Sequence, residues 1–214
     1  MCQAERGLER IGGGAHNWLM RENVVKGKLL IISGPSGAGK TSICRALLER
    51  IPDSCWSVSV TTRAKRGDEV DGQEYRFITR DAFERMVSDG DLLEHAVYLG
   101  NAYGTPRKPV EDAIAAGRII VLEIDVQGGA QVARRIPDSI RVFVLPPTME
   151  TLKARLEGRR TESAALQQRR LAEADGEIAF AQDSGHYPHV ITNDILQDSV
   201  EQVLEIVRRE MEHE

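Results

Sequence analysis

The sequence predicts an α/β fold in which helices flank a parallel β-sheet. Short apolar runs alternate along the chain with longer segments that carry apolar residues at helical spacing, an order typical of parallel strands joined by helices. The apolar run Ile119–Ile124 is typical of a strand that is covered on both faces. The run Leu29–Ser33 leads directly into a glycine-rich turn and then a helix, which places that turn at the carboxyl end of a strand.

The predicted strands are short runs rich in apolar and β-branched residues. In chain order they are Leu29–Ser33, Ser57–Val60, Tyr75–Ile78, Ile119–Ile124, Arg141–Leu145 and Val190–Thr192. The stretch 59–105 interrupts the alternation with turns and short strands, which predicts a lobe inserted into the main domain.

The predicted helices are marked by apolar residues three and four apart and by residues typical of helix ends. Pro52 stops the first helix, Gly117 ends the third, and Thr148 caps the fifth. In chain order they are Lys40–Arg50, Asp81–Ser88, Pro106–Ala116, Val126–Arg135, Thr148–Leu156, Ser163–Ala181 and Asp198–Met211.

Length and composition restrict the classes of protein to which this chain can belong. The chain has 214 residues, which fits one domain with insertions and a core that needs no disulfide bonds. The 28 Lys and Arg and 33 Asp and Glu nearly balance to a net charge of −5, which argues against disorder and against a general nucleic-acid binder. The cysteines, Cys2, Cys44 and Cys55, form no CxxC pair, so we expect no zinc site and a reducing, cytoplasmic compartment. No apolar run approaches the roughly 20 residues of a membrane span.

Residues 1–26 differ from the rest of the chain. They carry Gly12-Gly13-Gly14, scattered charges and no sustained period, so we expect a disordered tail followed by one domain over residues 27–214. The segment lacks the apolar stretch of a secretory signal, and its acidic residues argue against a transit peptide. Met20 is an alternative start.

A glycine-rich P-loop motif, G-x-x-x-x-G-K-T, spans residues 34–41 between a predicted strand and a predicted helix. Its glycines let successive backbone N–H groups turn towards phosphate oxygens, and the amino end of the helix attracts the same anion. Lys40 adds a positive charge for the β- and γ-phosphates, and the Thr41 hydroxyl suits a Mg²⁺ ion. The motif therefore predicts binding of a nucleoside triphosphate.

A second basic segment follows in a region expected to be a loop. Arg63 and Arg66 lie three residues apart among small polar residues, and Tyr75 follows them. Arginine side chains bind phosphate oxygens in pairs, and a tyrosine hydroxyl adds a neutral donor. A solvated surface loop is the alternative. The P-loop favours a second phosphate site, because a phosphotransferase must also hold a negatively charged acceptor.

Six segments together resemble the guanylate kinase family. They are GPSGAGKTS (34–42), SVTTRAKRGDEVDGQEY (59–75), LEHAVYLGNAYGT (93–105), EIDVQGGAQ (123–131), RLEGRR (155–160) and TND (192–194). The resemblance extends over about residues 28–212, and the order of the middle segments is more specific than the P-loop alone. It implies a parallel-sheet core (27–58, 106–154 and 172–214), a GMP-binding insert (59–105) and a helical lid (155–171).

The resemblance implies that the P-loop and the lid bind ATP. The ATP-binding residues would be Gly34, Pro35, Ser36, Gly37, Ala38, Gly39, Lys40, Thr41, Ser42, Arg159 and Asn193. The catalytic residues would be Lys40, Arg63, Arg155, Arg159 and Arg170. Arg160 and Arg169 are open between a lid contact and a salt-bridged helix surface. Thr41 would meet Mg²⁺, with waters held by Glu123 and Asp125; Glu123 stands where the family has Asp, which keeps the charge and changes its reach.

The resemblance also implies a GMP site in the insert. Its residues would be Ser59, Arg63, Arg66, Tyr75, Glu94, Tyr103, Thr105 and Asp125. Guanine presents N1–H and the 2-amino group as adjacent donors that the Glu94 carboxylate can accept together, whereas adenine would leave that carboxylate facing a lone pair. The hydroxyls of Ser59 and Thr105 can donate to guanine O6. Ala102 stands where the family often has tyrosine, and we expect it to trim an aromatic wall of the site.

The implied reaction of purine nucleotide metabolism is Mg²⁺-dependent transfer of the ATP γ-phosphoryl group to GMP, giving ADP and GDP. An acceptor phosphate is already ionised at neutral pH, so no general base is needed. The implied partners are these nucleotides, with no nucleic acid or membrane, and the oligomeric state is left open. The alternatives are a P-loop kinase of a sugar bisphosphate, a non-catalytic guanylate-kinase-like protein-binding module, and a regulatory GTPase. The base-edge residues Ser59, Glu94 and Thr105 argue against the sugar bisphosphate, and the retained P-loop lysine argues against the non-catalytic module. In a regulatory GTPase the second arginine site would have no purpose.

Overall fold

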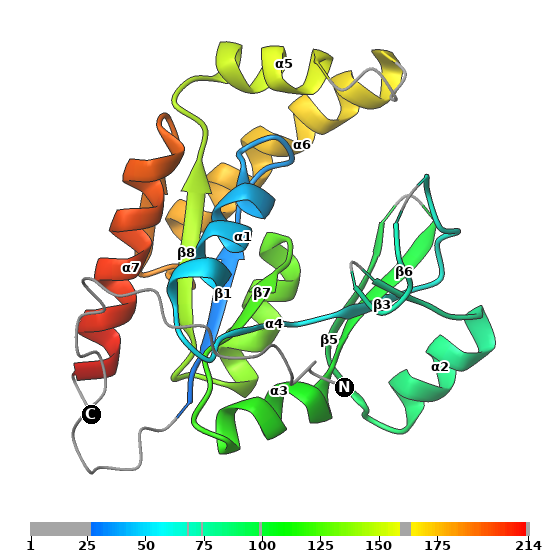
Figure 1. Cartoon of the computed structure of the whole chain (residues 1–214). Coiled ribbons are helices and arrows are strands. Elements are labelled where there is room, and N and C mark those ends of the chain that lie inside the picture. The colour runs from blue at the N-terminus through cyan, green and yellow to red at the C-terminus, as the bar shows by residue number, and fades with distance from the viewer. Residues whose placement is uncertain (1–26, 68, 74, 99, 159–163, 213–214) are drawn as a thin grey trace.

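The computed structural model describes residues 27–67, 69–73, 75–98, 100–158 and 164–212. The predicted tail, with Cys2 and Met20, lies outside these residues, as do Arg159 and Arg160 of the expected lid. The described chain forms a five-stranded sheet and a four-stranded sheet, which occupy separate parts of the molecule (Figure 1). None of the described helices is long and apolar enough to cross a lipid bilayer.

The five-stranded sheet is parallel throughout and forms the predicted core of the α/β fold. In sheet order its strands are β2 (Cys55–Trp56), β7 (Ile120–Glu123), β1 (Leu29–Ser33), β8 (Ile140–Leu145) and β9 (His189–Thr192). β1 lies in the middle, where Leu30 pairs with Val121 on one side and with Ile140 on the other. All of β1 is buried, as expected for a parallel strand covered on both faces.

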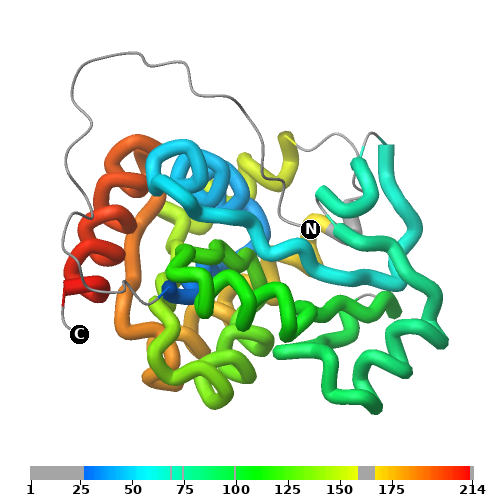
Figure 2. The backbone as a smooth tube through the Cα atoms, turned by 60° about the horizontal axis from the view of Figure 1, so that its bottom comes forward, coloured from blue at the N-terminus to red at the C-terminus, as the bar shows by residue number. Residues whose placement is uncertain are grey.

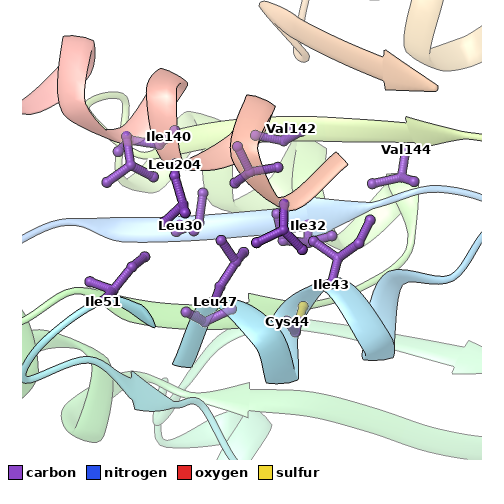
Figure 3. Packing of buried hydrophobic residues seen from close by; sticks show 14 of the residues in the cluster. Leu30, Ile32, Ile43, Cys44, Leu47, Ile51, Ile140, Val142, Val144 and Leu204 are labelled. Atoms are coloured by element: carbon purple, nitrogen blue, oxygen red, sulfur yellow. The ribbon is translucent and has the colours of Figure 1, made fainter. Parts of the chain in front are cut away.

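Helices cover both faces of this sheet. On one face Leu30 and Ile32 pack with two helices that lie side by side (Figures 2 and 3). On the other face Leu29 and Ile31 pack with two more. This alternation along β1 is the two-residue period of a strand. The first pair is α1 (Lys40–Arg50) and α7 (Leu196–Glu212), and the second pair is α3 (Arg107–Ala115) and α4 (Val126–Arg135).

The four-stranded sheet belongs to the predicted insert. In sheet order its strands are β4 (Tyr75–Phe77), β3 (Ser59–Thr61), β6 (Asn101–Pro106) and β5 (Leu92–Tyr98), and the lobe also contains α2 (Arg80–Ser88). β5 and β6 are antiparallel, with Ala96 opposite Tyr103. A separate buried cluster stabilises the lobe: Val60, Phe83, Leu92 and Ala102.

Two helices follow the carboxyl end of β8. They are α5 (Met149–Glu157) and α6 (Ala164–Asp183). Leu152 and Leu156 of α5 pack against Ala174 of α6. Near its other end, α6 packs Ala181 against Phe143 of β8. α6 therefore connects the segment predicted as the lid with the central sheet.

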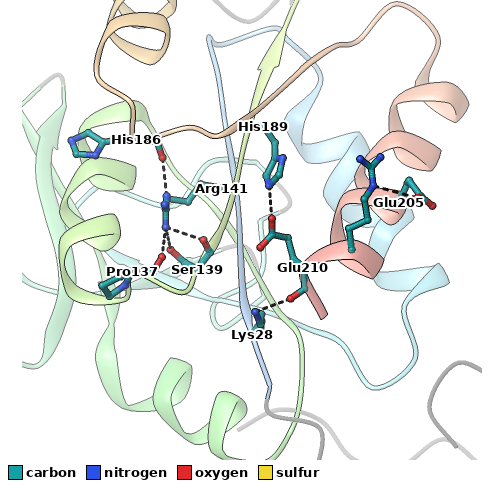
Figure 4. A network of polar contacts seen from close by, with 9 residues as sticks. Lys28, Pro137, Ser139, Arg141, His186, His189, Glu205 and Glu210 are labelled. Atoms are coloured by element: carbon teal, nitrogen blue, oxygen red, sulfur yellow. Dashed lines mark hydrogen bonds and ion pairs between the residues drawn. The ribbon is translucent and has the colours of Figure 1, made fainter. Parts of the chain in front are cut away.

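Polar contacts hold the amino end of the central sheet (Figure 4). Lys28 Nζ donates to the backbone carbonyl of Glu210 at 2.8 Å, and the His189 ring contacts the Glu210 carboxylate at 3.0 Å. The Arg141 guanidinium donates to three backbone carbonyls, those of Pro137, Ser139 and His186. These contacts tie α7 and β8 to the end of the sheet opposite the P-loop.

The helix-end predictions are confirmed at several points. The helices Lys40–Arg50 and Val126–Arg135 have the predicted bounds. The Thr148 hydroxyl accepts the Thr151 backbone N–H as a cap, and Gly117 follows α3 with a φ of 74°. The predicted strand Ser57–Val60 was wrong in its bounds. Residues 57 and 58 lie between β2 and β3, where the chain passes from the central sheet into the lobe, and the strand of the lobe begins at Ser59.

Candidate functional site

A cleft of about 640 Å³ lies between the P-loop, the inserted lobe and α6, at the carboxyl ends of β1 and β7. This edge is where parallel sheets bind ligands. The core contributes Gly34, Ser36, Lys40, Thr41, Arg45, Trp56, Ser57, Glu123, Ile124 and Asp125. The lobe contributes Ser59, Arg63, Arg66, Glu69, Gln73, Tyr75, Glu94, Ala96, Tyr98, Tyr103 and Gly104, and α6 contributes Arg170, Glu173 and Glu177.

The P-loop follows a backbone path that requires glycine at two points. Gly34 has a φ of 144°, and a Cβ there would lie 2.3 Å from a backbone carbonyl oxygen of β8. Gly39 precedes α1 with a φ of 95°, and a Cβ there would lie 2.2 Å from Asn193 Nδ2. Lys40 Nζ donates to the carbonyl oxygens of Gly34 at 2.7 Å and Pro35 at 3.2 Å. The motif thus forms the predicted strand–loop–helix, with the lysine in the cleft.

Asn193 supports the P-loop from outside the cleft lining. Its Nδ2 donates to the Ala38 carbonyl at 2.7 Å, and its Oδ1 accepts the Ser199 hydroxyl at 3.0 Å. The residue is only 5% exposed. Its side-chain amide is therefore engaged by the loop and by α7. The role of Asn193 in binding ATP stays a prediction.

Two of the predicted lid arginines contact the P-loop or the residue that supports it. Arg170 Nη1 donates to the Ser36 hydroxyl of the P-loop at 2.6 Å. Arg155 Nη2 donates to the backbone carbonyl of Asn193 at 3.1 Å. Of these two arginines, Arg170 lines the cleft and Arg155 does not. Arg170 therefore contacts the P-loop directly, and Arg155 contacts Asn193, which in turn contacts the P-loop.

α6 also contacts the lobe across the cleft. The Tyr98 hydroxyl of β5 donates to Glu173 Oε2 at 3.0 Å, and Arg169 donates to Glu173 Oε1 at 2.9 Å. The Arg169 pair joins residues one helical turn apart at the surface, which supports the salt-bridged alternative for Arg169. Arg159 and Arg160 lie outside the described residues.

Oxygen groups suited to a metal lie beside the P-loop. Thr41 Oγ1 donates to Glu123 Oε1 at 3.1 Å. Asp125 Oδ1 accepts the backbone N–H groups of Gln127 and Gly128 at 2.9 and 2.8 Å, which caps α4. A hydroxyl and one or two carboxylates beside bound phosphates are the ligands that Mg²⁺ prefers, so Thr41 and Glu123 fit this ion.

Arg63 lies at the centre of the predicted acceptor-phosphate site. It is 8% exposed and forms two hydrogen bonds with the Glu69 carboxylate, at 2.7 and 3.0 Å. The bond to Glu69 raises the pKa of Arg63, so its charge is secure. Tyr75 packs edge-on against Tyr103 with ring centres 5.9 Å apart, and burial raises the pKa of Tyr75 to about 12, so it is a neutral donor. Arg66 is exposed and lines the same cleft.

Glu94 is a buried carboxylate in the wall of the cleft. It is 4% exposed, and the Thr105 hydroxyl donates to its Oε1 at 2.6 Å. Burial raises the pKa of Glu94 to about 7, and the negative charge of Asp125 adds to the rise. An ionised carboxylate has about four acceptor positions, so Glu94 can accept further donors from a ligand. Thr105 donates to Glu94 here, which differs from the expected donation to guanine O6.

The charges of Lys40 and Asp125 both act on the carboxyl group of Glu177 in α6. Burial raises its pKa to about 7, Lys40 lowers it, and Asp125 and Glu173 raise it. Within the part of the chain that the structure describes, nothing hydrogen-bonds its buried Oε2. The cleft therefore balances its basic groups with acidic groups from α6 as well as from the core.

The structure brings most of the predicted site residues into one cleft. These are Gly34, Ser36, Lys40, Thr41, Ser59, Arg63, Arg66, Tyr75, Glu94, Tyr103, Glu123, Asp125 and Arg170. The predicted residues outside its lining are Pro35, Gly37, Ala38, Gly39, Ser42, Thr105, Arg155 and Asn193. The expectation for Ala102 was wrong: its side chain packs in the lobe core with Phe83, on the opposite face of β6 from the cleft-lining Tyr103.

Eleven residues of the cleft lining were not predicted as site residues from the sequence: Arg45, Trp56, Ser57, Glu69, Gln73, Ala96, Tyr98, Gly104, Ile124, Glu173 and Glu177. A signal for Tyr98 was present, because Glu94, Ala96 and Tyr98 alternate along β5 and all line the cleft. Assigning β5 as a strand would have found it. The acidic residues of α6 carry no motif of their own.

Comparison with known proteins decides the family. The family model described as guanylate kinase matches residues 26–210. The chain belongs to the guanylate kinase family. It is 45% identical over 184 residues to a guanylate kinase of Rubrobacter xylanophilus, covering 86% of this chain and 95% of that one. It is 46% identical over 182 residues to a guanylate kinase of Thiobacillus denitrificans, covering 85% and 86%. The crystal structure of guanylate kinase from Anaplasma phagocytophilum matches with a TM-score of 0.72 at 32% identity, covering 87% of each chain.

Proposed function

We propose that this chain transfers the γ-phosphoryl group of ATP to GMP and forms ADP and GDP. One observation carries the proposal: a P-loop, an arginine–tyrosine cluster and a buried carboxylate line one cleft. The P-loop suits the triphosphate of ATP, the arginine–tyrosine cluster suits the phosphate of GMP, and the carboxylate suits the edge of the guanine base. Family membership supports the same activity.

Glu94 supplies the selectivity for guanine in this proposal. Its carboxylate accepts the adjacent N1–H and 2-amino donors of guanine, and Thr105 holds one of its oxygens at 2.6 Å. Adenine lacks both donors and would leave a buried, partly desolvated carboxylate against a ring nitrogen. An unmade hydrogen bond of this kind costs about 1–3 kcal/mol, and more for a charged group.

Arg63, Arg66, Tyr75 and Tyr103 bind the GMP phosphate in this proposal. Arginine donors can take two phosphate oxygens at once, and the tyrosines add neutral donors without adding charge. The acceptor oxygen carries no proton to remove at neutral pH. The catalytic work is therefore alignment of the two phosphates and neutralisation of charge.

The P-loop and the lid arginines hold ATP. Lys40 lies in the cleft and faces the β- and γ-phosphates, while Arg155, Arg159 and Arg170 stabilise the charge on the group being transferred. Thr41 and Glu123 would hold Mg²⁺, with Asp125 orienting its waters, and the bound ion supplies charge neutralisation at the phosphates. The separate lobe and α6 would close on the substrates and exclude water.

The residues of the chain also bear on its cellular compartment and on the alternative functions. The chain has three cysteines and no CxxC pair, which supports a reducing, cytoplasmic location. A sugar bisphosphate has no donor pair for Glu94, so a kinase of that substrate is not favoured. A non-catalytic module has no need of Lys40 in the cleft.

The experiment is a coupled assay of ADP formation with ATP, Mg²⁺ and one of GMP, AMP, CMP or UMP. We expect ADP formation that depends on GMP and is far slower with the other three. ADP formation that does not depend on GMP would overturn the proposal.

A further inference from the structure

We infer that Glu69 is a positioning residue that orients Arg63 and the turn carrying Arg66 for the acceptor phosphate, a role that rests on the proposed function. Glu69 lines the cleft beside both arginines. Its Oε1 accepts Arg63 Nη2 at 2.7 Å, and its Oε2 accepts Arg63 Nη1 at 3.0 Å. This is a two-point pairing of a planar fork with a carboxylate, which fixes direction as well as distance.

A count of the donors on Arg63 shows what the pairing leaves for a ligand. Nη1 gives one proton to Glu69 and the other to the Ala64 carbonyl at 2.7 Å. Nη2 gives one of its two protons to Glu69. The second Nη2 proton and the Nε proton lie on the adjacent edge of the guanidinium, and they point in parallel. That edge has the spacing that matches two oxygens of a phosphate.

Two aromatic rings of β4 lie beside the guanidinium, with their centres 6.3 Å apart. The Arg63 guanidinium carbon lies 5.4 Å from the centre of the Tyr75 ring and 5.6 Å from that of Phe77. The guanidinium thus has the Glu69 carboxylate on one edge and two rings beside it, and these contacts limit its movement. An arginine fixed before the ligand arrives loses less side-chain entropy on binding, which strengthens the binding of the phosphate.

The same carboxylate organises the second arginine. Glu69 Oε2 also accepts the backbone N–H of Arg66 at 2.8 Å, and the Glu69 N–H donates to the Arg66 carbonyl at 3.1 Å. Residues 66 and 69 are thus closed into a turn by two bonds. Arg66 is exposed and lines the cleft. The turn therefore fixes the backbone position from which its side chain extends into the cleft.

A competing role for Glu69 predicts the opposite result. If the carboxylate only occupied Arg63 until a phosphate displaced it, removing it would free a cation and tighten GMP binding. The donor count argues for positioning, because Glu69 takes one edge and leaves another. The hydrogen bond with Arg63 lowers the pKa of Glu69, so the carboxylate is ionised at neutral pH and the pairing persists.

The experiment measures binding and turnover for the variants Glu69→Ala, Glu69→Gln, Arg63→Ala and the double variant Arg63→Ala with Glu69→Ala. Glu84→Ala is the matched control, since Glu84 pairs with Arg80 in the same lobe and does not line the cleft. GMP and ATP affinities are read by calorimetric titration, and kcat and KM by ADP formation. Thermal unfolding reports the fold.

We expect Glu69→Ala to weaken GMP binding about tenfold, and Glu69→Gln by less because one acceptor oxygen remains. ATP affinity and the unfolding temperature should match those of Glu84→Ala. In the Arg63→Ala background, Glu69→Ala should cost less than it does alone, because only its bond to the Arg66 backbone is then left to act.

Unchanged or tighter GMP binding in Glu69→Ala would overturn the inference. So would a full additional loss in the Arg63→Ala background, or a parallel loss of ATP affinity and thermal stability, which indicates a structural role alone. Measurements of GMP binding and GDP formation by the wild-type chain separate the role of Glu69 from the proposed function. GMP binding without GDP formation overturns the proposed function and leaves the titrations to decide Glu69; absence of GMP binding overturns both.

Discussion

The Thr105 hydroxyl donates to Glu94 Oε1 at 2.6 Å inside a wall of the cleft where both residues are buried. The bond joins two neighbouring strands, since Glu94 of β5 lies opposite Thr105 of β6. It fixes one carboxylate oxygen and orients the other. In the proposed function, the selectivity for guanine therefore depends on a group that is held before any ligand binds.

Replacing Glu94 by Gln should lower kcat/KM for GMP about a hundredfold, because two charge-assisted hydrogen bonds to guanine are weakened. The KM for ATP should not change. Steady-state kinetics with GMP and AMP measure the effect, with Glu84→Gln as the control in the same lobe. Unchanged discrimination between GMP and AMP would remove Glu94 from the base site.

GMP binding should weaken as the pH falls below about 7. Glu94 has a pKa raised to about 7, so below that pH it takes a proton and can no longer accept both guanine donors. We expect the Kd for GMP to rise by up to about tenfold per pH unit there. Titrations of the wild type and Glu94→Gln separate this effect from ionisation of the GMP phosphate itself. Parallel curves for the two proteins would contradict the assignment.

The same ionisation affects stability in the opposite direction. A carboxyl with a folded-state pKa near 7 and an unfolded value near 4.5 binds its proton more tightly in the folded chain. Its stabilising contribution is complete below pH 4.5 and is lost as the pH rises through 7. Glu94→Gln should therefore flatten the fall in free energy of unfolding between these values, as measured by denaturant titration. A slope that matches the wild type would contradict the raised pKa.

Asn193→Ala should weaken ATP binding and leave GMP binding unchanged. The substitution removes the side-chain donor to the Ala38 carbonyl of the P-loop, whereas the Ser199 hydroxyl keeps the Ile195 carbonyl as a partner at 3.1 Å. We expect a loss of about 1–3 kcal/mol in unfolding free energy and a higher Kd for ATP. Ser199→Ala is the matched control, because it keeps the bond to the P-loop and should cost less. Equal effects of the two variants on ATP binding would exclude a role for the Ala38 contact.

Tyr98 and Glu173 should be energetically coupled across the cleft. Their hydrogen bond at 3.0 Å links the lobe to α6. A double-mutant cycle of Tyr98→Phe and Glu173→Gln, read by denaturant unfolding, should give a coupling of about 0.5–1.5 kcal/mol. The cycle cancels the separate pair between Glu173 and Arg169. Simple additivity of the two substitutions would show that the bond does not hold the lobe to the helix.

The core of the fold could be predicted because its signals are local. The buried run Leu29–Ser33, the P-loop glycines and the helix of Lys40–Arg50 follow one another in the sequence and need no distant contact to be recognised. β5 was not assigned because Glu94, buried next to Leu93, interrupts the alternation with a register shift. β6 was not assigned because its sequence, NAYGTP, contains Gly and Pro, which are rare in strands. A strand with a buried carboxylate departs from the alternation of apolar and polar residues that predicts a strand.

The candidate site could be predicted where a motif fixes its residues. The contacts of Glu69 and Glu173 could not, because they depend on how a turn closes on Arg63 and how α6 lies against Tyr98. These are tertiary relationships between segments without a periodic pattern. For the same reason, the sequence did not show that Asn193 holds the P-loop or that Ala102 faces the lobe core.

The central claim is transfer of a phosphoryl group between two nucleotides in one cleft. The most direct measurement supplies ATP labelled in the γ-phosphoryl group together with GMP and Mg²⁺, and separates the products by chromatography. The account predicts that the label appears in GDP in step with the formation of ADP, and that Arg63→Ala nearly abolishes it. Label found in inorganic phosphate and absent from GDP would contradict the account.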